Sequence, residues 1–287
     1  MIKYILILIT PLMVFSASPP VPVPNVQMDC FEHQKPRKWS FCINRYNGSK
    51  SKSLVIYLHG KSGGIKRWNN LEYDTGKLYQ TWQKLGLEAP TVVSISFGKL
   101  WFLAHNPSTP KQGLFYDFIH TSLPEIYSKL NQEFDKKILF GISMGGVNTL
   151  MTIMKTKTLF DKAASICPPI TNFSPHAPFQ TIWKYYLRSS ISTWRTFQKV
   201  LIGKKLYPDL KSWHANDPII LAKAIPKNYL PSKIYLSCGA KDTWECMEGS
   251  LEIKRIFESK GVDLQWVPKP GGHCDIDQES LALFLAS

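Results

Sequence analysis

The sequence predicts an α/β fold built on a mostly parallel, twisted sheet of about eight strands with helices on both faces. Short apolar runs of strand length alternate with longer segments of helical pattern, and this alternation indicates right-handed crossovers in a doubly wound sheet. Most of these runs are apolar throughout, as expected for strands that are buried on both faces.

The predicted elements begin with an antiparallel hairpin, formed by residues 26–34 and 39–46, that opens the sheet. Further strands are predicted at residues 54–59, 91–97, 137–140, 162–167, 233–237 and 263–267. Helices are predicted at residues 74–85, 114–133, 145–156, 244–259 and 276–286. The stretch 171–230 is far longer than an ordinary connection and is rich in aromatic and basic residues, so we expect a helical cap inserted over the site.

The chain is long enough for one large domain, which we place at residues 26–287. Residues 1–18 combine a short positive start, an apolar core and small residues, and this pattern predicts a secretory signal peptide. A membrane anchor is disfavoured because the apolar run is shorter than about 20 residues and contains Pro11. Residues 19–25 are expected to form a stiff Pro-rich leader. The sequence therefore predicts an exported protein, secreted or periplasmic, with no stable membrane insertion after cleavage.

Residues 141–146 read Gly-Ile-Ser-Met-Gly-Gly and lie between a strand-like run and a helix-like run. Strand, tight turn and helix form the context of a nucleophile elbow, in which a serine occupies a strained turn and glycines let the helix pack close to the strand. Such a turn exposes the Ser143 hydroxyl as a nucleophile and directs the amide of Met144 at the same point. A Gly-rich turn with an inert serine is the alternative, which the motif alone does not exclude.

Two polar residues follow predicted strands nearer the C-terminus. Asp242 comes after a strand and a Gly turn, and His273 comes after the last strand and a Pro/Gly-rich turn. The carboxyl ends of strands are where an open parallel sheet places its active site. The order Ser143, Asp242, His273 is that of α/β-hydrolase triads and differs from both major serine-protease orders. Glu245 is a rival for the triad acid, and Asp242 is preferred because it directly follows the strand and turn.

A loop of small residues supplies the second oxyanion donor in a site of this kind. The first parallel strand ends in His59-Gly60 and continues into Lys61-Ser-Gly-Gly64. The amide of Lys61 is the predicted donor beside that of Met144, with the amide of Gly60 as second choice. His59 is interpreted as a structural histidine that fixes the loop, because it lies too early in the chain to be the triad base.

The segments that carry a family resemblance are Leu58-His-Gly60, Gly141-Ile-Ser-Met-Gly145, Asp217-Pro218, Cys238-Gly-Ala-Lys-Asp242 and Gly271-Gly-His273. With them the chain resembles the esterase D-type branch of the α/β-hydrolase superfamily over roughly residues 26–287. That branch includes feruloyl and acetylxylan esterases, enterochelin esterase, S-formylglutathione hydrolase and the mycolyltransferases. The resemblance implies Ser143 as nucleophile, His273 as base and Asp242 as its orienting acid. One departure is Lys61, which stands where relatives often carry glycine or an apolar residue.

The implied activity is hydrolysis of a small-molecule or polysaccharide-linked carboxylic ester through an acyl-enzyme, with no cofactor and no metal. A serine peptidase of the prolyl-oligopeptidase type shares the triad order, but the absence of a propeller domain counts against it. Acyl transfer to a sugar or lipid is a further alternative. A non-catalytic binding protein on the same fold is disfavoured by the intact Ser143, Asp242 and His273.

The formal net charge is +14, and no nucleic-acid-binding motif accompanies it. A solvated basic surface is the plain interpretation. Attraction of an anionic substrate, polymer or envelope surface is the sharper one, because Lys61, Lys66 and Arg67 stand close to the predicted site. The aromatic residues of the stretch 171–230 predict a preference for an apolar or aromatic acyl group.

The six cysteines of an exported chain are free to form disulfides. Cys30 and Cys42 lie in the two strands of the predicted hairpin, so a bridge across it is plausible. Cys246 follows the Asp242 loop and Cys274 adjoins His273, so a bridge between these two cysteines would pin acid and base together. The remaining two, Cys167 and Cys238, are expected to be buried thiols at the ends of neighbouring strands. Sequence alone leaves the connectivity open.

Overall fold

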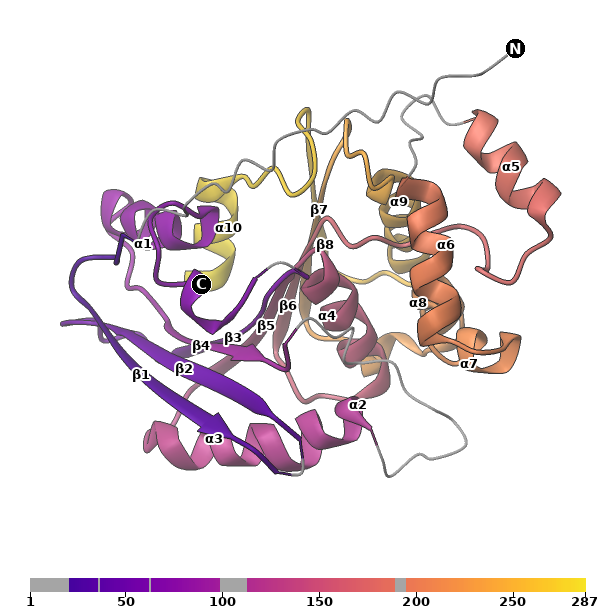
Figure 1. Cartoon of the computed structure of the whole chain (residues 1–287). Coiled ribbons are helices and arrows are strands. Elements are labelled where there is room, and N and C mark those ends of the chain that lie inside the picture. The colour runs from indigo at the N-terminus through magenta and orange to yellow at the C-terminus, as the bar shows by residue number, and fades with distance from the viewer. Residues whose placement is uncertain (1–20, 36, 62, 99–112, 189–194) are drawn as a thin grey trace, which may run out of the picture.

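A computed structural model describes residues 21–287, apart from residues 36, 62, 99–112 and 189–194. Its central element is an open sheet with the strand order β1-β2-β4-β3-β5-β6-β7-β8 (Figure 1). The strands are β1 (Val26–His33), β2 (Trp39–Tyr46), β3 (Ser53–Leu58), β4 (Thr91–Ser96), β5 (Lys136–Ile142), β6 (Lys162–Ile166), β7 (Lys233–Gly239) and β8 (Leu264–Lys269). The pairings β1–β2 and β2–β4 are antiparallel, and all others are parallel. The predicted mostly parallel α/β sheet is therefore confirmed.

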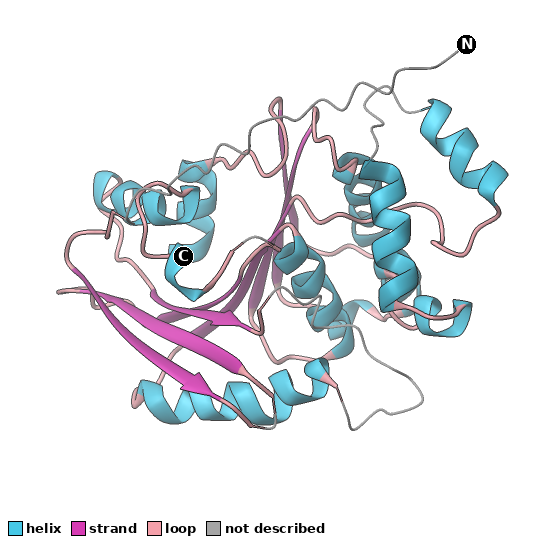
Figure 2. Ribbon diagram, in the orientation of Figure 1, coloured by secondary structure: helices cyan, strands magenta, loops and turns pink. Residues whose placement is uncertain are grey.

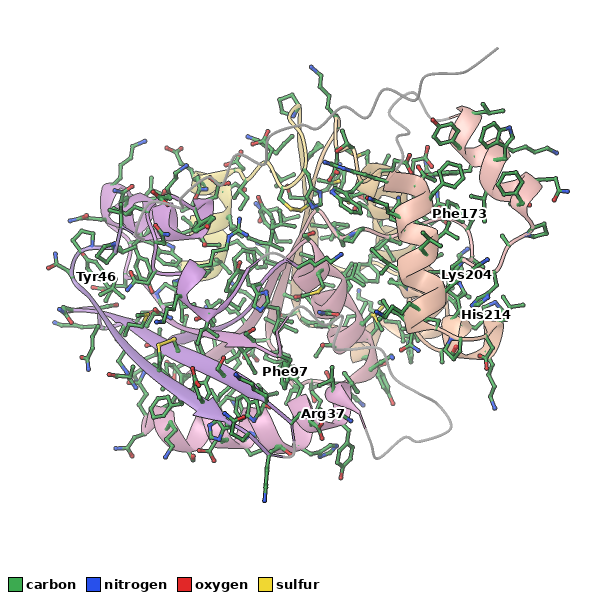
Figure 3. The ribbon with its side chains drawn as sticks, in the orientation of Figure 1. Arg37, Tyr46, Phe97, Phe173, Lys204 and His214 are labelled. Carbon is green, nitrogen blue, oxygen red and sulfur yellow. A yellow bond between two sulfur atoms is a disulfide. The ribbon has the colours of Figure 1, made fainter. Side chains whose placement is uncertain are left out.

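The hairpin at the edge of the sheet is closed covalently. Cys30 and Cys42 face one another in the antiparallel register and form a disulfide (Figure 3). The bridge predicted from their positions in the sequence is thus confirmed. The inner strands β3, β4 and β6 are buried along their whole length, which explains their continuous apolar sequences.

Helices cover both faces of the sheet (Figure 2). On one face, α1 (Asp74–Lys84) and α10 (Gln278–Ala286) contribute to a core that includes Tyr57, Trp82 and Leu285. On the other face lie α2 (Leu114–Asp117), α3 (Leu123–Leu130), α4 (Met144–Lys155), α8 (Pro218–Ala224) and α9 (Cys246–Ser259). Parallel strands need this two-sided cover because neither face can be left to water.

The predicted helix 114–133 is interrupted. A π-helical turn, η2 (Phe118–Ser122), joins α2 to α3. Pro124 lies in the first turn of α3 and has no amide hydrogen to donate to the carbonyl four residues earlier, which accounts for a local change of helical pitch. Phe118 in this turn packs edge-on against Phe97, which follows β4 (Figure 3).

The stretch 171–230 connects β6 to β7 and is helical, as predicted. It contains α5 (Phe179–Arg188), α6 (Arg195–Leu206), α7 (Leu210–His214), α8 and the short helix η3 (Lys227–Tyr229). Part of this stretch belongs to the main domain, because α8 packs against α4 and α9 and contributes Ile219 and Ala222 to the main core. On α6 and α7, Lys204 and His214 are exposed (Figure 3).

The predicted signal peptide, residues 1–18, lies outside the described residues, as does the start of the predicted leader. The described part of the leader is docked on the domain. Val23 is buried and donates its amide to Asn69 Oδ1 at 3.0 Å, and Leu71 donates its amide to the carbonyl of Val21 at 2.9 Å. None of the described helices is long and apolar enough to cross a bilayer.

Candidate active site

Ser143 occupies the turn between β5 and α4. Its backbone has φ 56° and ψ −117°, a conformation that side-chain-bearing residues rarely adopt. Its amide donates to the carbonyl of Ile166 on the neighbouring strand at 2.8 Å, so the turn is fixed to the sheet. Glycine is required on either side for a steric reason. A Cβ at Gly145 would collide with the carbonyl of Leu58, and one at Gly141 would collide with the carbonyl of Gly145.

The structure brings together three of the residues singled out in the sequence. Ser143 Oγ lies 2.9 Å from Nε2 of His273, and Nδ1 of His273 lies 2.8 Å from Oδ2 of Asp242. With a neutral imidazole, the Nδ1 hydrogen is donated to the carboxylate and Nε2 accepts the hydrogen of the serine hydroxyl. This chain of hydrogen bonds can move the hydroxyl proton to His273 and leave Ser143 Oγ as a nucleophile.

Asp242 is completely buried and both of its carboxylate oxygens are engaged. Oδ2 accepts from His273, while Oδ1 accepts from the amide of Trp244 at 2.8 Å. Cys238 contributes a weaker contact, with Sγ 4.0 Å from Oδ2. A carboxylate held from both sides fixes the tautomer and orientation of the imidazole that it contacts.

The rival acid Glu245 lies elsewhere. Its Oε1 accepts from the Thr196 hydroxyl at 2.6 Å, and its Oε2 lies 3.2 Å from Nζ of Lys199. Both partners belong to α6, and the Lys199–Glu245 pair is buried, with side-chain exposures of 7% and 1%. Glu245 therefore joins the helical insert to the loop of Asp242.

The loop after β3 lies against the nucleophile turn. A Cβ on Gly60 would be 3.4 Å from Cβ and 4.0 Å from Oγ of Ser143, so the backbone of Gly60 passes directly beside the hydroxyl. Lys61 follows it and lines the same cavity. Met144 is the first residue of α4, and the amides at a helix N-terminus have no partner within the helix and favour negative charge.

His59 is buried beneath this loop, where its ring bonds in two directions. Nδ1 lies 2.6 Å from the carbonyl of Gly60, and Nε2 lies 2.8 Å from the hydroxyl of Ser96. Burial lowers the pKa of His59, and the positive charge of Arg67 lowers it further against the opposing effect of the bond to Gly60. The ring is therefore neutral and ties the Gly60 backbone to β4, in the structural position expected for it.

The sequence profile of the family described as "Putative esterase" matches residues 44–256, about three quarters of the chain. The chain belongs to this family. The resemblance drawn from its motifs is thus confirmed, and the protein is a carboxylic ester hydrolase. No curated protein sequence matches the esterase significantly.

Solved structures similar to the esterase share its α/β-hydrolase fold. A ferulic acid esterase has a TM-score of 0.63 and 14% identity, over 91% of this chain and 98% of that one. The S-formylglutathione hydrolase of Agrobacterium tumefaciens has a TM-score of 0.60 and 14% identity, over 91% and 92%. Brefeldin A esterase, a bacterial homologue of human hormone-sensitive lipase, has a TM-score of 0.65 and 17% identity, over 94% and 80%. At sequence identities this low, the structural similarity establishes the fold and leaves the substrate open.

A cavity of about 510 Å³ opens beside Ser143 and His273 in the esterase. This volume is within the range of pockets that hold small molecules. Helix α6 of the insert forms part of its wall, and so does the loop after β3. The residues that line the cavity include Gly60, Lys61, Arg67, Tyr73, Ile170, Lys199, Ile202, Leu206, Tyr207, Trp213, Trp244 and Cys274.

The predicted bridge between Cys246 and Cys274 is wrong. Cys274 pairs with Cys167 at the end of β6, so Cys167 is not a free thiol. Cys246 begins α9 and points into the core, where its thiol contacts that of Cys238 and lies 3.9 Å from Nδ1 of His273. Cys238 is a buried free thiol, as expected. No local sequence signal distinguishes the two pairings, because both would join loops at the same edge of the sheet.

Two groups of potential metal ligands occur among the described residues, and both use His273. In the first, the sulfur atoms of Cys167 and Cys274 are bonded to one another. In the second, Asp242 and His273 are already joined by a hydrogen bond beside Cys246. The donors of both groups are thus already engaged, in the disulfide or in the hydrogen bonds of His273, and they do not form a metal centre.

Proposed function

We propose that the protein is an exported serine esterase that cleaves carboxylic esters with Ser143, His273 and Asp242 as its catalytic triad. The observation that carries the proposal is the unbroken chain of hydrogen bonds, 2.9 Å from Ser143 Oγ to His273 and 2.8 Å from His273 to Asp242, at the wall of a cavity. The family and the strained turn at Ser143 support the same roles.

In the first half-reaction, His273 Nε2 takes the hydroxyl proton while Ser143 Oγ attacks the ester carbonyl. The negative charge that develops on the carbonyl oxygen is stabilised by the amides of Met144 and Lys61, with Gly60 as the alternative second donor. Each such donor contributes roughly 3–4 kcal/mol to transition-state stabilisation. The protonated His273, held by Asp242, then gives its proton to the departing alcohol.

The second half-reaction removes the acyl group from Ser143. Water enters, His273 takes one of its protons, and the hydroxide attacks the acyl carbonyl over the same oxyanion donors. The proton returns to Ser143 as the acid leaves, which restores the starting state. Every proton moves between Ser143, His273 and the reactants.

A fluorophosphonate probe tests the nucleophile directly. It should form one adduct, located on the peptide that contains Ser143, and Ser143→Ala should abolish both labelling and hydrolysis of p-nitrophenyl butyrate. The loss of turnover should reach at least about 10⁴-fold with an unchanged melting temperature. Ser128→Ala, at an exposed serine on α3, is the matched control. An adduct on another serine, or retained turnover in Ser143→Ala, would refute the triad.

Export is the second part of the proposal. The two disulfides favour an oxidising compartment, since cytosolic proteins rarely keep such bonds. The intact mass of protein recovered outside the cytosol should correspond to cleavage near residues 16–18. An unprocessed chain that remains in the cytosol would contradict this part alone.

A further inference from the structure

The cavity beside Ser143 has two walls of different chemistry. Helices α6 and α7 supply an apolar wall, with Ile202 and Leu206 from α6 and Trp213 from α7. The loop between β3 and α1 supplies the other wall, with Lys61, Arg67 and Tyr73. A substrate that fills the cavity therefore meets hydrocarbon and aromatic surface on one side and positive charge on the other.

Arg67 is held in place by its surroundings. It ends the short helix η1 (Ile65–Arg67), and its amide donates to the carbonyl of Gly64 at 3.2 Å. Its guanidinium carbon lies 4.1 Å from the ring centroid of Tyr73, a cation–π contact. This contact restrains the guanidinium, whose N–H donors can form a fork for two oxygen atoms of a carboxylate or phosphate.

The positive charge on this wall is not neutralised within the described part of the chain. There, no carboxylate pairs with Lys61 or Arg67, and Asp74, the acidic residue that also lines the cavity, is bound to Lys77 at 3.1 Å. Lys199 lines the cavity too, but its charge is matched by Glu245. The field of Arg67 reaches inward, because it contributes to the lowered pKa of His59.

We propose that Arg67, assisted by Lys61, binds an anionic group of the ester, a carboxylate or a phosphate, while the α6 wall holds the apolar part. This inference rests on the proposed function and specifies its substrate class as esters with one apolar half and one anionic half. Arg67 is the main determinant because it is half-buried and oriented by Tyr73, whereas Lys61 is exposed and screened by water.

Matched ester pairs test the proposal. p-Nitrophenyl butyrate is compared with 5-butyryloxy-2-nitrobenzoate, which carries a carboxylate on the leaving group, and with p-nitrophenyl hemisuccinate, which carries it on the acyl group. Butyryl-glycerol is compared with butyryl-glycerol 3-phosphate, so that the two kinds of anion are distinguished. The readout is the ratio of kcat/KM for the anionic ester to that for its neutral partner, after correction for the rate with hydroxide.

Arg67→Gln should lower this ratio about tenfold in at least one pair, since a hydrogen-bonded charge pair is lost. Arg67→Lys should give an intermediate value, because the charge stays and the fork is lost. Lys66→Gln makes the same charge change one residue away, at an exposed side chain that does not line the cavity, and should leave the ratio unchanged. Raised ionic strength should lower the wild-type ratio.

Equal ratios in wild type and Arg67→Gln for every pair would overturn the inference, and so would a fall of equal size in Lys66→Gln. If Arg67→Gln does not fold, the inference is tested by the ratio in Arg67→Lys and by the dependence of the wild-type ratio on ionic strength. Binding of 5-hydroxy-2-nitrobenzoate to Ser143→Ala, monitored by tryptophan fluorescence, tests the anion site separately from the proposed ester hydrolysis. Salt-sensitive binding that Arg67→Lys weakens supports the anion site even where hydrolysis fails, and binding that Arg67→Lys leaves unchanged opposes it even where hydrolysis succeeds.

Discussion

The disulfide between Cys167 and Cys274 ties the end of β6 to the residue that follows His273. Strands β6 and β8 are not neighbours, because β7 lies between them in the sheet. The bond therefore reaches across the end of β7, where the loop of Asp242 begins. The two cysteines are 107 positions apart in the chain, and the whole helical insert lies between them. One covalent bond thus holds the loop of the base beside that of the acid.

The double variant Cys167→Ser/Cys274→Ser should lose both stability and turnover. Closing a loop of about 100 residues stabilises a fold by about 4–5 kcal/mol in the chain-entropy model. The freed loop of His273 should also lower kcat several-fold, because its hydrogen bond to Ser143 loses a fixed geometry. Thermal unfolding and kcat for p-nitrophenyl butyrate measure the two effects.

The other disulfide provides the control. Cys30→Ser/Cys42→Ser opens a much shorter loop in the edge hairpin, with a separation of 12 positions, and should lower stability without changing kcat. Assays are run at a temperature where both variants are folded. Wild-type kcat in the Cys167/Cys274 variant would mean that the remaining contacts suffice to hold His273.

The two acids of the loop after β7 should respond differently to removal of their charge. Asp242→Asn should lower kcat by about 10⁴-fold with little change in fold, because the amide presents the wrong partner to His273 Nδ1. Glu245→Gln should mainly lower the melting temperature, because it leaves Lys199 as a buried, unpaired cation. Steady-state kinetics compare kcat, and calorimetry compares the melting temperature, in the two variants. A larger loss of kcat in Glu245→Gln would transfer the role of triad acid to Glu245.

Much of the site could be predicted from the sequence because its signals are local. Apolar runs identify the buried strands, and Gly141 and Gly145 are needed wherever a helix passes this close to a strand, so the turn at Ser143 is readable from six residues. Ser143, Asp242 and His273 also each follow a predicted strand, and parallel strands end at the same edge of the sheet.

The remaining features depend on how distant loops meet. Cys274 faces Cys167 rather than Cys246 because Cys246 turns inward at the start of α9, which spacing along the chain does not show. The pair of Glu245 with Lys199 likewise depends on the position of α6. The contact of Arg67 with Tyr73 requires the path of the loop after β3. Each of these three contacts joins two segments, and neither segment's sequence indicates that it will meet the other.

The turn at Ser143 should not tolerate a methyl group at Gly145. In Gly145→Ala the new Cβ would overlap the carbonyl of Leu58, a backbone atom that cannot move without displacing β3. We expect a loss of stability of about 1–3 kcal/mol or more, together with lost activity. Gly64→Ala places its Cβ in open space and should fold normally. Thermal unfolding of the two variants makes the comparison, and equal melting temperatures would show that the strand can shift.

Lys155 near the end of α4 should make stability depend on pH. Burial lowers its pKa to about 7, and Nζ donates to Asn216 Oδ1 at 2.6 Å. In the unfolded chain the pKa of a lysine is about 10.4, so protonation favours unfolding. The contribution of Lys155 to stability is fully present above about pH 10.4 and is lost as pH falls toward 7.

Lys155→Met removes this titration and keeps a flexible apolar chain beside Phe115. We expect the variant to melt roughly 2–5 °C above the wild type at pH 7, where the buried cation is costly. The difference should shrink toward zero as pH rises through about 10.4, because the wild-type amine is then neutral in both the folded and the unfolded chain. Lys157→Met, at an exposed lysine two residues further on, should show no such trend. A difference that stays constant from pH 7 to pH 10, or a variant less stable than the wild type at pH 7, would show that Lys155 is solvated as a cation in the folded protein.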